Sequence, residues 1–302
     1  MRSKKKYMVL SVILIIFSIF TLGGCSNKTK ELKIFGGDII RYSLCIEDNK
    51  STIVSCPIIT TKKVNNISLN SFKSNQKEEI SITVNGFEKD SMVQYGNYYI
   101  YFVILNLSCK RNDTLIDAKI NQLNFDIDGK TIEYKTPYFN VKNTLYFMQK
   151  NSLLQDDKCL KISGDYTGIY GYVPDKQRKA NLCLTSDKDI TIKSYQVLDY
   201  LKVNDFTLHD SNDKLENCKS DQLNKMLKKD GDMLFDYTIS LMDNVSDLNI
   251  IRSSQIIIYN YDGRDFIWVY TPGIYIWKDY SDYGNIKKYI DEQSSSLDDE
   301  RG

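Results

Sequence analysis

Apolar and polar residues alternate along most of this chain, which predicts β-strands separated by short turns. In Ile80–Val84 every second residue is apolar, and the turn pair Asn85-Gly86 follows directly. The longer stretch Tyr98–Leu107 is apolar at both alternating sets of positions. A strand with two apolar faces is typical of the middle of a sheet that is covered on both sides.

The dipeptide Asp-Gly, which favours a tight hairpin turn, occurs between two pairs of candidate strands. The first hairpin joins Leu123–Ile127 to Thr131–Tyr134, and the second joins Ile256–Tyr261 to Phe266–Tyr270. Because Thr271-Pro272-Gly273 has the composition of another turn, we expect the following Ile274–Trp277 to add a third strand to the second hairpin.

One segment departs from the strand pattern. In Asp221–Lys229 an aspartate can cap a helix, and Leu223, Met226 and Leu227 have helical spacing. Gly231 would end the segment. The pattern predicts one short helix in the second half of the chain.

The two halves of the chain share an order of elements at a fixed offset. The Asp-Gly turns lie 134 residues apart (262 − 128), and the same offset aligns Tyr101–Leu107 with Phe235–Leu241. Each hairpin is followed by Thr-Pro, at Thr136-Pro137 and Thr271-Pro272. This order predicts two copies of one β domain.

The spacing of strands and turns is that of immunoglobulin-like sandwiches, although the Cys…Trp…Cys spacing of antibody domains does not occur. We therefore expect an all-β protein of two tandem immunoglobulin-like β-sandwich domains, residues 31–150 and 151–288. Residues 289–302 are polar and acidic, and we expect them to form a disordered tail.

The first residues of the chain have the composition of an export signal. Basic residues at positions 2–6 precede the apolar run Met8–Leu22, which is short for a membrane span. Leu22-Gly23-Gly24-Cys25 follows and resembles the bacterial lipobox. The resemblance implies a signal peptide over 1–24, acylation of Cys25, a tether over 25–30, and attachment to the outer face of the cytoplasmic membrane. The alternative is an uncleaved signal anchor with an incidental thiol.

Composition narrows the class of protein further. Lys and Arg number 40 against 39 Asp and Glu, so no net field attracts nucleic acid. The abundance of Lys, Asn, Ile and Tyr suggests an AT-rich genome. With the lipobox, the chain resembles the β-sandwich surface lipoproteins of Gram-positive bacteria, a likeness of class that no family motif supports.

Six cysteines remain after Cys25, and an exported protein can pair them. Cys45 and Cys56 are near enough in sequence to suggest a disulfide across a turn. The alternative is that both thiols are small buried apolar groups.

Residues for catalysis or metal binding do not stand out. The single histidine, His209, lies where a strand is expected to end, and Ser211 nearby gives no triad. Asn124–Gly129 starts like a calcium-binding loop, but Lys135 stands where the closing glutamate is needed. We therefore expect no catalytic residues, no metal and no cofactor, although a carboxylate pair could act as acid and base.

Aromatic residues concentrate near the C-terminus, where nine of the 25 residues in Tyr259–Tyr283 are Tyr, Trp or Phe. Rings on one sheet face could stack on sugars or meet a protein, and the candidates are Trp268, Tyr270, Tyr275 and Trp277. The alternative is that these rings form the core between two sheets.

The sequence favours a binding module at the cell envelope, with an envelope protein or a wall polysaccharide as partner. A carboxylate-dependent envelope hydrolase is the first alternative. A substrate-binding lipoprotein of a transporter is the second, but such proteins alternate strands with long helices.

Overall fold

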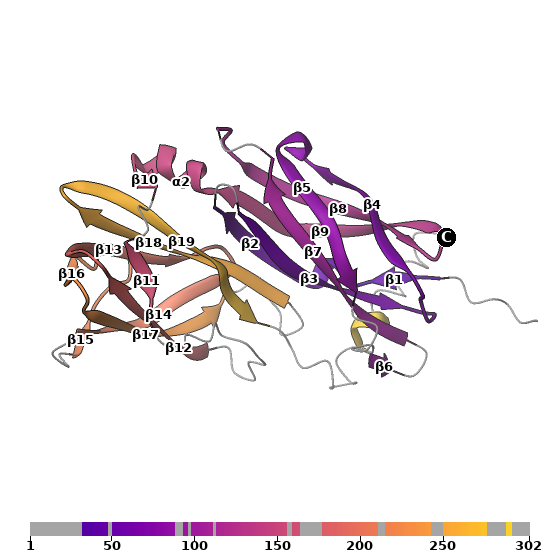
Figure 1. Cartoon of the computed structure of the whole chain (residues 1–302). Helices are drawn as coiled ribbons and strands as arrows, with labels where there is room; N and C mark the ends of the chain where they lie inside the picture. Colours follow the sequence, from indigo (N-terminus) through magenta and orange to yellow (C-terminus); the bar gives the residue numbers. More distant parts are fainter. Residues whose placement is uncertain are drawn as a thin grey trace, which may run out of the picture. The chain divides into compact units, whose positions relative to one another are not determined.

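The chain folds almost entirely into β-strands (Figure 1). The computed structural model describes residues 32–47, 50–87, 93–95, 98–110, 113–155, 159–163, 177–210, 215–242, 250–276 and 288–291. Residues 34–302 belong to one compact unit. The signal segment, Cys25, the tether and Trp277 lie outside the described residues.

The strands of the first half precede a short helix, α2 (Thr144–Asn151). They are β1 (Ile34–Phe35), β2 (Ile40–Ile46), β3 (Ser51–Thr60), β4 (Ile67–Ser74), β5 (Ile80–Phe87), β6 (Val93–Tyr95), β7 (Tyr98–Cys109), β8 (Asp117–Ile127) and β9 (Lys130–Asn143). Two 3-10 turns, η1 (Gly37–Ile39) and η2 (Lys77–Glu79), connect some of them.

The strands of the second half follow α2. They are β10 (Leu154–Gln155), β11 (Leu160–Ile162), β12 (Gln177–Ser186), β13 (Ile190–Val197), β14 (Leu201–Asp210), β15 (Leu215–Asn217), β16 (Lys225–Leu227), β17 (Asp232–Leu241), β18 (Ile250–Tyr261) and β19 (Arg264–Ile276). A helical turn at residues 288–291 overlaps the first three residues of the range 289–302 expected to form a disordered tail, and its Tyr289 and Ile290 are buried.

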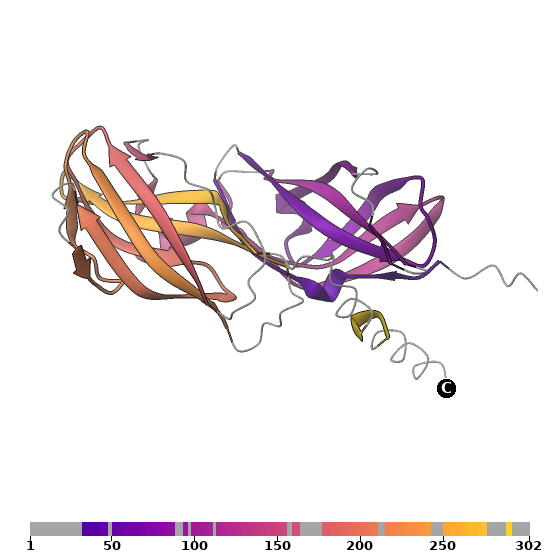
Figure 2. The same ribbon diagram turned by 90° about the horizontal axis from the view of Figure 1, so that it is seen from below.

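Two layers of strands make the sandwich of the first half (Figures 1 and 2). One sheet has the order β1-β3-β7-β5, and the facing strands are β2-β9-β8-β4. These orders match strands A-B-E-D and G-F-C of immunoglobulin domains, with β2 running parallel to β9. The hydroxyls of Tyr42 and Tyr134 donate hydrogen bonds across the layers, to the carbonyls of Ser55 and Pro57. The all-β sandwich prediction is confirmed.

The second half repeats the strand pairing of the first. Its sheet β12-β17-β14 repeats β3-β7-β5, and β13-β18-β19 repeats β4-β8-β9, always antiparallel. A short strand also runs parallel to the last hairpin strand in both halves, β2 beside β9 and β10 beside β19. Only β7–β9 and β17–β19 keep the expected offset of 134 residues, and the earlier strands pair alike at shorter offsets. The duplication itself stays a prediction, and we call the two halves the first and second copy.

Strand β2 connects the sheets of both copies. It pairs with β9 of its own copy and, through Ile40–Ser43, with Ile250–Ser253 of β18. The result is one nine-stranded sheet. The division into separate domains at residue 150 stays a prediction.

Both predicted hairpins are present with the expected turns. Asp128 and Gly129 have φ of 49° and 81°, and Asp262 and Gly263 have φ of 50° and 72°. Two successive positive φ angles are the requirement of a type I′ turn. Each hairpin also has a bulge at its Thr-Pro dipeptide, where the register shifts between Ile120 and Gln122 in β8 and between Ser253 and Gln255 in β18.

The bulge explains why the predicted third strand of the second hairpin is wrong. Thr271-Pro272-Gly273 does not turn the chain; β19 continues past it, and Ile274 pairs with Ser253 of the same partner strand. Gln255 pairs with Tyr270, so three residues of β19 are accommodated opposite one residue of β18.

The helix predicted at Asp221–Lys229 is also wrong. Asn224 has a φ of 47°, a left-handed conformation that interrupts a helix. Leu227 pairs with Ile190 as part of β16, and the backbone N–H of Leu223 donates to the carbonyl of Lys193 at 2.8 Å. Both leucines are buried in the core of the second copy, so tertiary packing outweighs local helical spacing.

The prediction that Tyr98–Leu107 is central is confirmed, because β7 lies between β3 and β5. One face of β7 is buried and the other is half-buried. Its counterpart β17 is likewise flanked by β12 and β14.

Candidate binding surface

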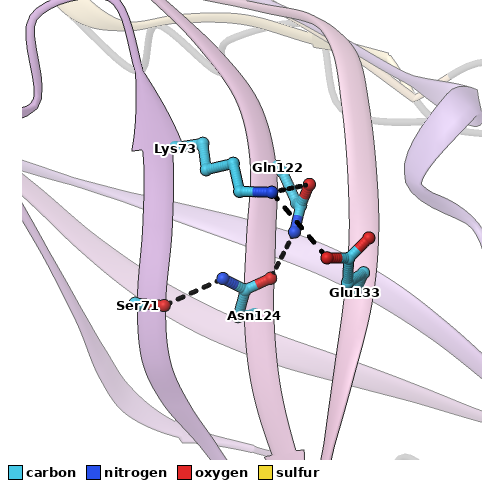
Figure 3. A network of polar contacts seen from close by, with 5 residues as sticks. All are labelled: Ser71, Lys73, Gln122, Asn124 and Glu133. Atoms are coloured by element: carbon cyan, nitrogen blue, oxygen red, sulfur yellow. Dashed lines mark hydrogen bonds and ion pairs between the residues drawn. The ribbon is translucent and has the colours of Figure 1, made fainter.

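Strands β4, β8 and β9 carry a row of polar side chains on the face turned away from the sandwich core (Figure 3). We call this surface the polar face and define it by Ser71, Lys73, Gln122, Asn124, Glu133 and Lys135. It exists because these strands alternate: Leu123, Phe125 and Tyr134 point to the core and are at most 2% exposed. The residues between them must then point outward.

Hydrogen bonds fix the side-chain amides of the polar face. Asn124 donates from Nδ2 to Ser71 Oγ at 2.8 Å, and its Oδ1 accepts from Gln122 Nε2 at 2.5 Å. Lys73 Nζ donates to Gln122 Oε1 at 3.0 Å and lies 3.7 Å from Glu133 Oε1. The chain of contacts holds both amides in one orientation and leaves Lys73 and Glu133 largely exposed.

The equivalent face of the second copy is apolar. At the offset of 134 residues, the polar-face residues of the first hairpin correspond to Ile256, Ile258, Ile267 and Val269. The cross-strand pairs correspond as well: Gln122 faces Lys135 and Ile256 faces Val269. We call this second surface the apolar face.

Helix α2 packs with the apolar face. Phe147 on the helix and Leu153 after it form one buried cluster with Ile256, Ile267 and Val269. Asn143 caps the N-terminus of this helix, and its side chain accepts a hydrogen bond from the backbone N–H of Tyr146 at 3.2 Å. The same topological face is therefore buried under a helix in the second copy and solvent-exposed in the first.

The aromatic residues predicted to bind a ligand are only partly exposed. Trp268 and Tyr270 stack with ring centroids 5.9 Å apart and planes 9° apart. Both are half-buried, and Trp268 packs against the core of the second copy. Tyr275 belongs to β19, but its side chain, like Trp277, lies outside the described part of the structure.

Tyr138 is a surface aromatic that the sequence did not single out. It is 39% exposed, and among the residues whose burial is described it is the one exposed aromatic side chain. It lies in the bulge after Thr136-Pro137, on the outer face, because the next residue, Phe139, packs edge-on against Tyr42 in the core. In the sequence, the two aromatic residues Tyr138 and Phe139 directly after Thr136-Pro137 were the feature that could have indicated this site.

Arg41 holds the Tyr138 ring in place. Its guanidinium carbon lies 3.6 Å from the ring centroid, and Nη1 donates to the backbone carbonyls of Asp38 and Ile40. Arg41 is 9% exposed, and burial lowers its pKa. A desolvated cation on a ring is a comparatively strong contact, so the Tyr138 side chain is preorganised.

Tyr200 supports the same region from the loop after β13. Asn140 Nδ2 donates to its hydroxyl at 3.0 Å, and the hydroxyl donates to the carbonyl of Tyr138 at 3.4 Å. Burial, aided by the nearby Asp199 charge, raises the pKa of Tyr200 to about 12. The residue has a φ of 70°, which is uncommon for a bulky side chain.

The other candidate residues have structural partners. His209 Nε2 lies 2.9 Å from Asp236 Oδ2 across β14 and β17. In the segment resembling a calcium loop, Asp126 accepts from the N–H of Gly129 and Asp128 from that of Asn66, both at 2.9 Å. The described ranges hold no cluster of three or more His, Cys, Asp or Glu side chains suited to a metal.

The predicted disulfide between Cys45 and Cys56 stays a prediction. Cys45 lies on β2 and Cys56 on β3, and both are fully buried. Burial raises the pKa of the Cys56 thiol, which suits the alternative of a buried apolar group. None of the helices in the described part of the chain has the length and apolar character needed to cross a membrane.

No protein-family model and no curated protein matches this chain. Among solved structures, a protein of unknown function from Porphyromonas gingivalis is similar over 82% of this chain and 99% of its own, at 11% identity and a TM-score of 0.25. The Enterococcus faecalis MSCRAMM ACE, described as binding its ligands by the collagen hug model, is similar over 83% of this chain and 96% of its own, at 12% identity and a TM-score of 0.27. The C-terminal domain of the Streptococcus agalactiae polypeptide BspA covers 82% and 99%, at 8% identity and a TM-score of 0.21. Scores this low carry no argument about function.

Proposed function

We propose that this chain is a membrane-anchored, extracytoplasmic binding protein of the cell envelope. The observation that carries the proposal is the contrast between the two copies. One sheet face is apolar and buried under α2, while its equivalent has a hydrogen-bonded array of polar groups in which Lys73 and Glu133 are exposed. The polar face is the binding surface in this proposal.

The preorganisation of the polar face supports a role in binding. Side chains that are already held in one rotamer lose little conformational entropy when a ligand arrives. Gln122 is 7% exposed although its amide faces outward, and both ends of the amide are hydrogen-bonded, to Lys73 on β4 and to Asn124 on its own strand. A surface that served solubility alone would need no such mutual orientation.

Retention by isolated envelopes tests the proposal. The full-length chain, purified in mild detergent, is mixed with sedimented cell walls of a Gram-positive bacterium, and the bound fraction is measured. We expect the wild type to sediment and the double variant Gln122→Ala/Asn124→Ala to bind about thirtyfold more weakly, since each substitution removes a hydrogen bond worth about 1 kcal/mol.

The matched control removes one Asn and one Gln side chain from the second copy. Asn181 on β12 and Gln196 on β13 are both exposed. The variant Asn181→Ala/Gln196→Ala should bind like the wild type. Equal binding by both double variants would show that the polar face is not the surface used, and release of soluble wall fragments would point to the hydrolase instead.

Acylation at Cys25 is tested separately in living cells. A Gram-positive host that expresses the chain is fed labelled palmitate, and we expect the label in the wild type and its loss in Cys25→Ser. Label that persists in Cys25→Ser would contradict the anchor.

A further inference from the structure

We infer that the ligand of the polar face is a neutral, hydroxyl-rich polysaccharide, with the Tyr138 ring as its stacking platform. The inference rests on the proposed function and adds the chemical class of the partner and one residue that contacts it. Three properties of the surface carry it: the kind of groups it presents, their balance of charge, and the position of one exposed ring.

The groups of the polar face match sugar hydroxyls better than a protein surface. Every described side chain that points outward from β4 and the β8–β9 hairpin up to the bulge is polar: Ser68, Ser71, Lys73, Gln122, Asn124, Asp126, Thr131, Glu133 and Lys135. Protein interfaces instead have an apolar core rich in aromatic residues and poor in Lys and Glu. Amides, carboxylates and ammonium groups can all exchange hydrogen bonds with hydroxyls.

The charges of these nine outward-pointing side chains cancel. Lys73 and Lys135 are offset by Asp126 and Glu133, and Lys73 lies within 3.7 Å of Glu133. A face that binds a polyanion such as a phosphate polymer or nucleic acid needs an excess of cations, because counterion release supplies most of the affinity. The balance therefore favours a neutral polymer over an acidic one.

Tyr138 supplies the apolar contact that the rest of the face lacks. It sits in the bulge between the pairs Ile120–Phe139 and Gln122–Lys135, at the end of the row of polar groups. Arg41 fixes the ring at 3.6 Å while 39% of the residue stays exposed. An amphipathic ring beside a row of hydrogen-bonding groups suits a sugar, which has both an apolar C–H face and a hydroxyl rim.

Three treatments of the wall identify the partner class. We expect the chain to be retained by walls treated with protease, to be lost from walls treated with periodate, which cleaves vicinal diols, and to remain bound at about 0.5 M salt, where surface charge is largely screened. Loss after protease treatment would assign the site to a protein. Loss at high salt would assign it to an acidic polymer.

Substitution of Tyr138 tests the platform itself. Tyr138→Phe keeps the ring and should bind within about twofold of the wild type, whereas Tyr138→Ala should bind about tenfold more weakly. Lys130→Ala, on the exposed hairpin tip, is the control for a surface change on the same strand. Circular dichroism and thermal unfolding establish that each variant is folded.

The outcomes separate this inference from the proposed function. A wild-type chain that is not retained by any wall preparation overturns both. Retention that resists periodate, or that Tyr138→Ala leaves unchanged, overturns the polysaccharide inference while envelope binding stands.

Discussion

Burial under α2 distinguishes the apolar face from the polar face. This can be tested by giving a residue of each face the side chain found at the equivalent position of the other copy. Ile267 on β19 is 1% exposed and packs in the cluster formed with α2. Its equivalent on β9, Glu133, has a side chain that is 62% exposed. We predict that Ile267→Glu is strongly destabilising and that Glu133→Ile is nearly neutral.

The expected change in the free energy of unfolding follows from the contacts that each side chain makes. Removing the fully buried Ile267 side chain costs about 2 kcal/mol of transfer free energy. Placing a carboxylate beside Phe147 and Leu153 costs about 2 kcal/mol more, whether the charge is buried or the helix moves away and exposes these side chains. The expected loss in the free energy of unfolding is about 4 kcal/mol, or about 10 °C in Tm for a chain of this size. Glu133→Ile loses an exposed ion pair worth about 0–1 kcal/mol.

Urea unfolding followed by circular dichroism and tryptophan fluorescence measures both variants. Ile267→Ala is the intermediate control, because it removes the apolar contact without adding a charge. An Ile267→Glu protein with an unchanged midpoint, or a Glu133→Ile protein destabilised as much as Ile267→Glu, would refute the assignment of a buried and an open face.

Three further predictions concern particular residues. Asp128→Ala should lower the free energy of unfolding in urea by about 1–2 kcal/mol more than Asp262→Ala. Both variants lose a favourable turn residue, but the Asp128 carboxylate also accepts hydrogen bonds from the backbone N–H groups of Asn65 and Asn66 before β4. Equal losses of stability in the two variants would contradict this. Asn224→Gly should be more stable than Asn224→Ala by about 1 kcal/mol, since the φ of 47° suits glycine, whereas a helix at this position would reverse the order. The pKa of Tyr200 is raised to about 12, so the folded state keeps this proton while the unfolded chain releases it above about pH 10. The contribution of Tyr200 to stability is therefore complete below pH 10 and is lost between pH 10 and 12. Tyr200→Phe should reduce the fall in unfolding free energy over that range, and an unchanged pH profile would contradict the raised pKa.

The features that could be predicted from the sequence are those fixed by local chemistry. The Asp-Gly hairpins follow from the positive φ angles that type I′ turns require, and both turns have them. The central strand β7 follows from its length and its apolar residues on both faces. The similar pairing of β7–β9 and β17–β19 follows because both features recur at one offset.

The features that could not be predicted depend on partners distant in sequence. Leu223 and Leu227 have helical spacing, but the neighbouring edge of β13 converts this segment to a turn and a strand. Thr271-Pro272 has turn composition, yet its position opposite β18 makes it a bulge within β19. In both cases strand pairing outweighs the local preference.

The polar face could not be predicted from the sequence for a related reason. Aromatic density drew attention to Trp268 and Tyr270, but density does not tell which face of a strand is buried. The contrast between Gln122 and Ile256 was visible at the repeat offset. This contrast can be interpreted only from the structure, which shows that β8 and β18 have equivalent positions in the two copies and that α2 covers the outer face of β18.

Connectivity alone does not decide which face α2 covers. The helix starts directly after β9 of the first copy and leads into β10, which pairs with β19 of the second. Phe147 and Leu153 gain free energy by leaving water, and the apolar face offers Ile256, Ile267 and Val269 to receive them. Over the polar face the same helix would desolvate two amides and two charges without replacing their hydrogen bonds. The difference in four residues between the two hairpins therefore explains both why α2 packs on the second copy and why the equivalent face of the first copy is not covered by this helix. In the proposed function, it is this face of the first copy that meets the ligand.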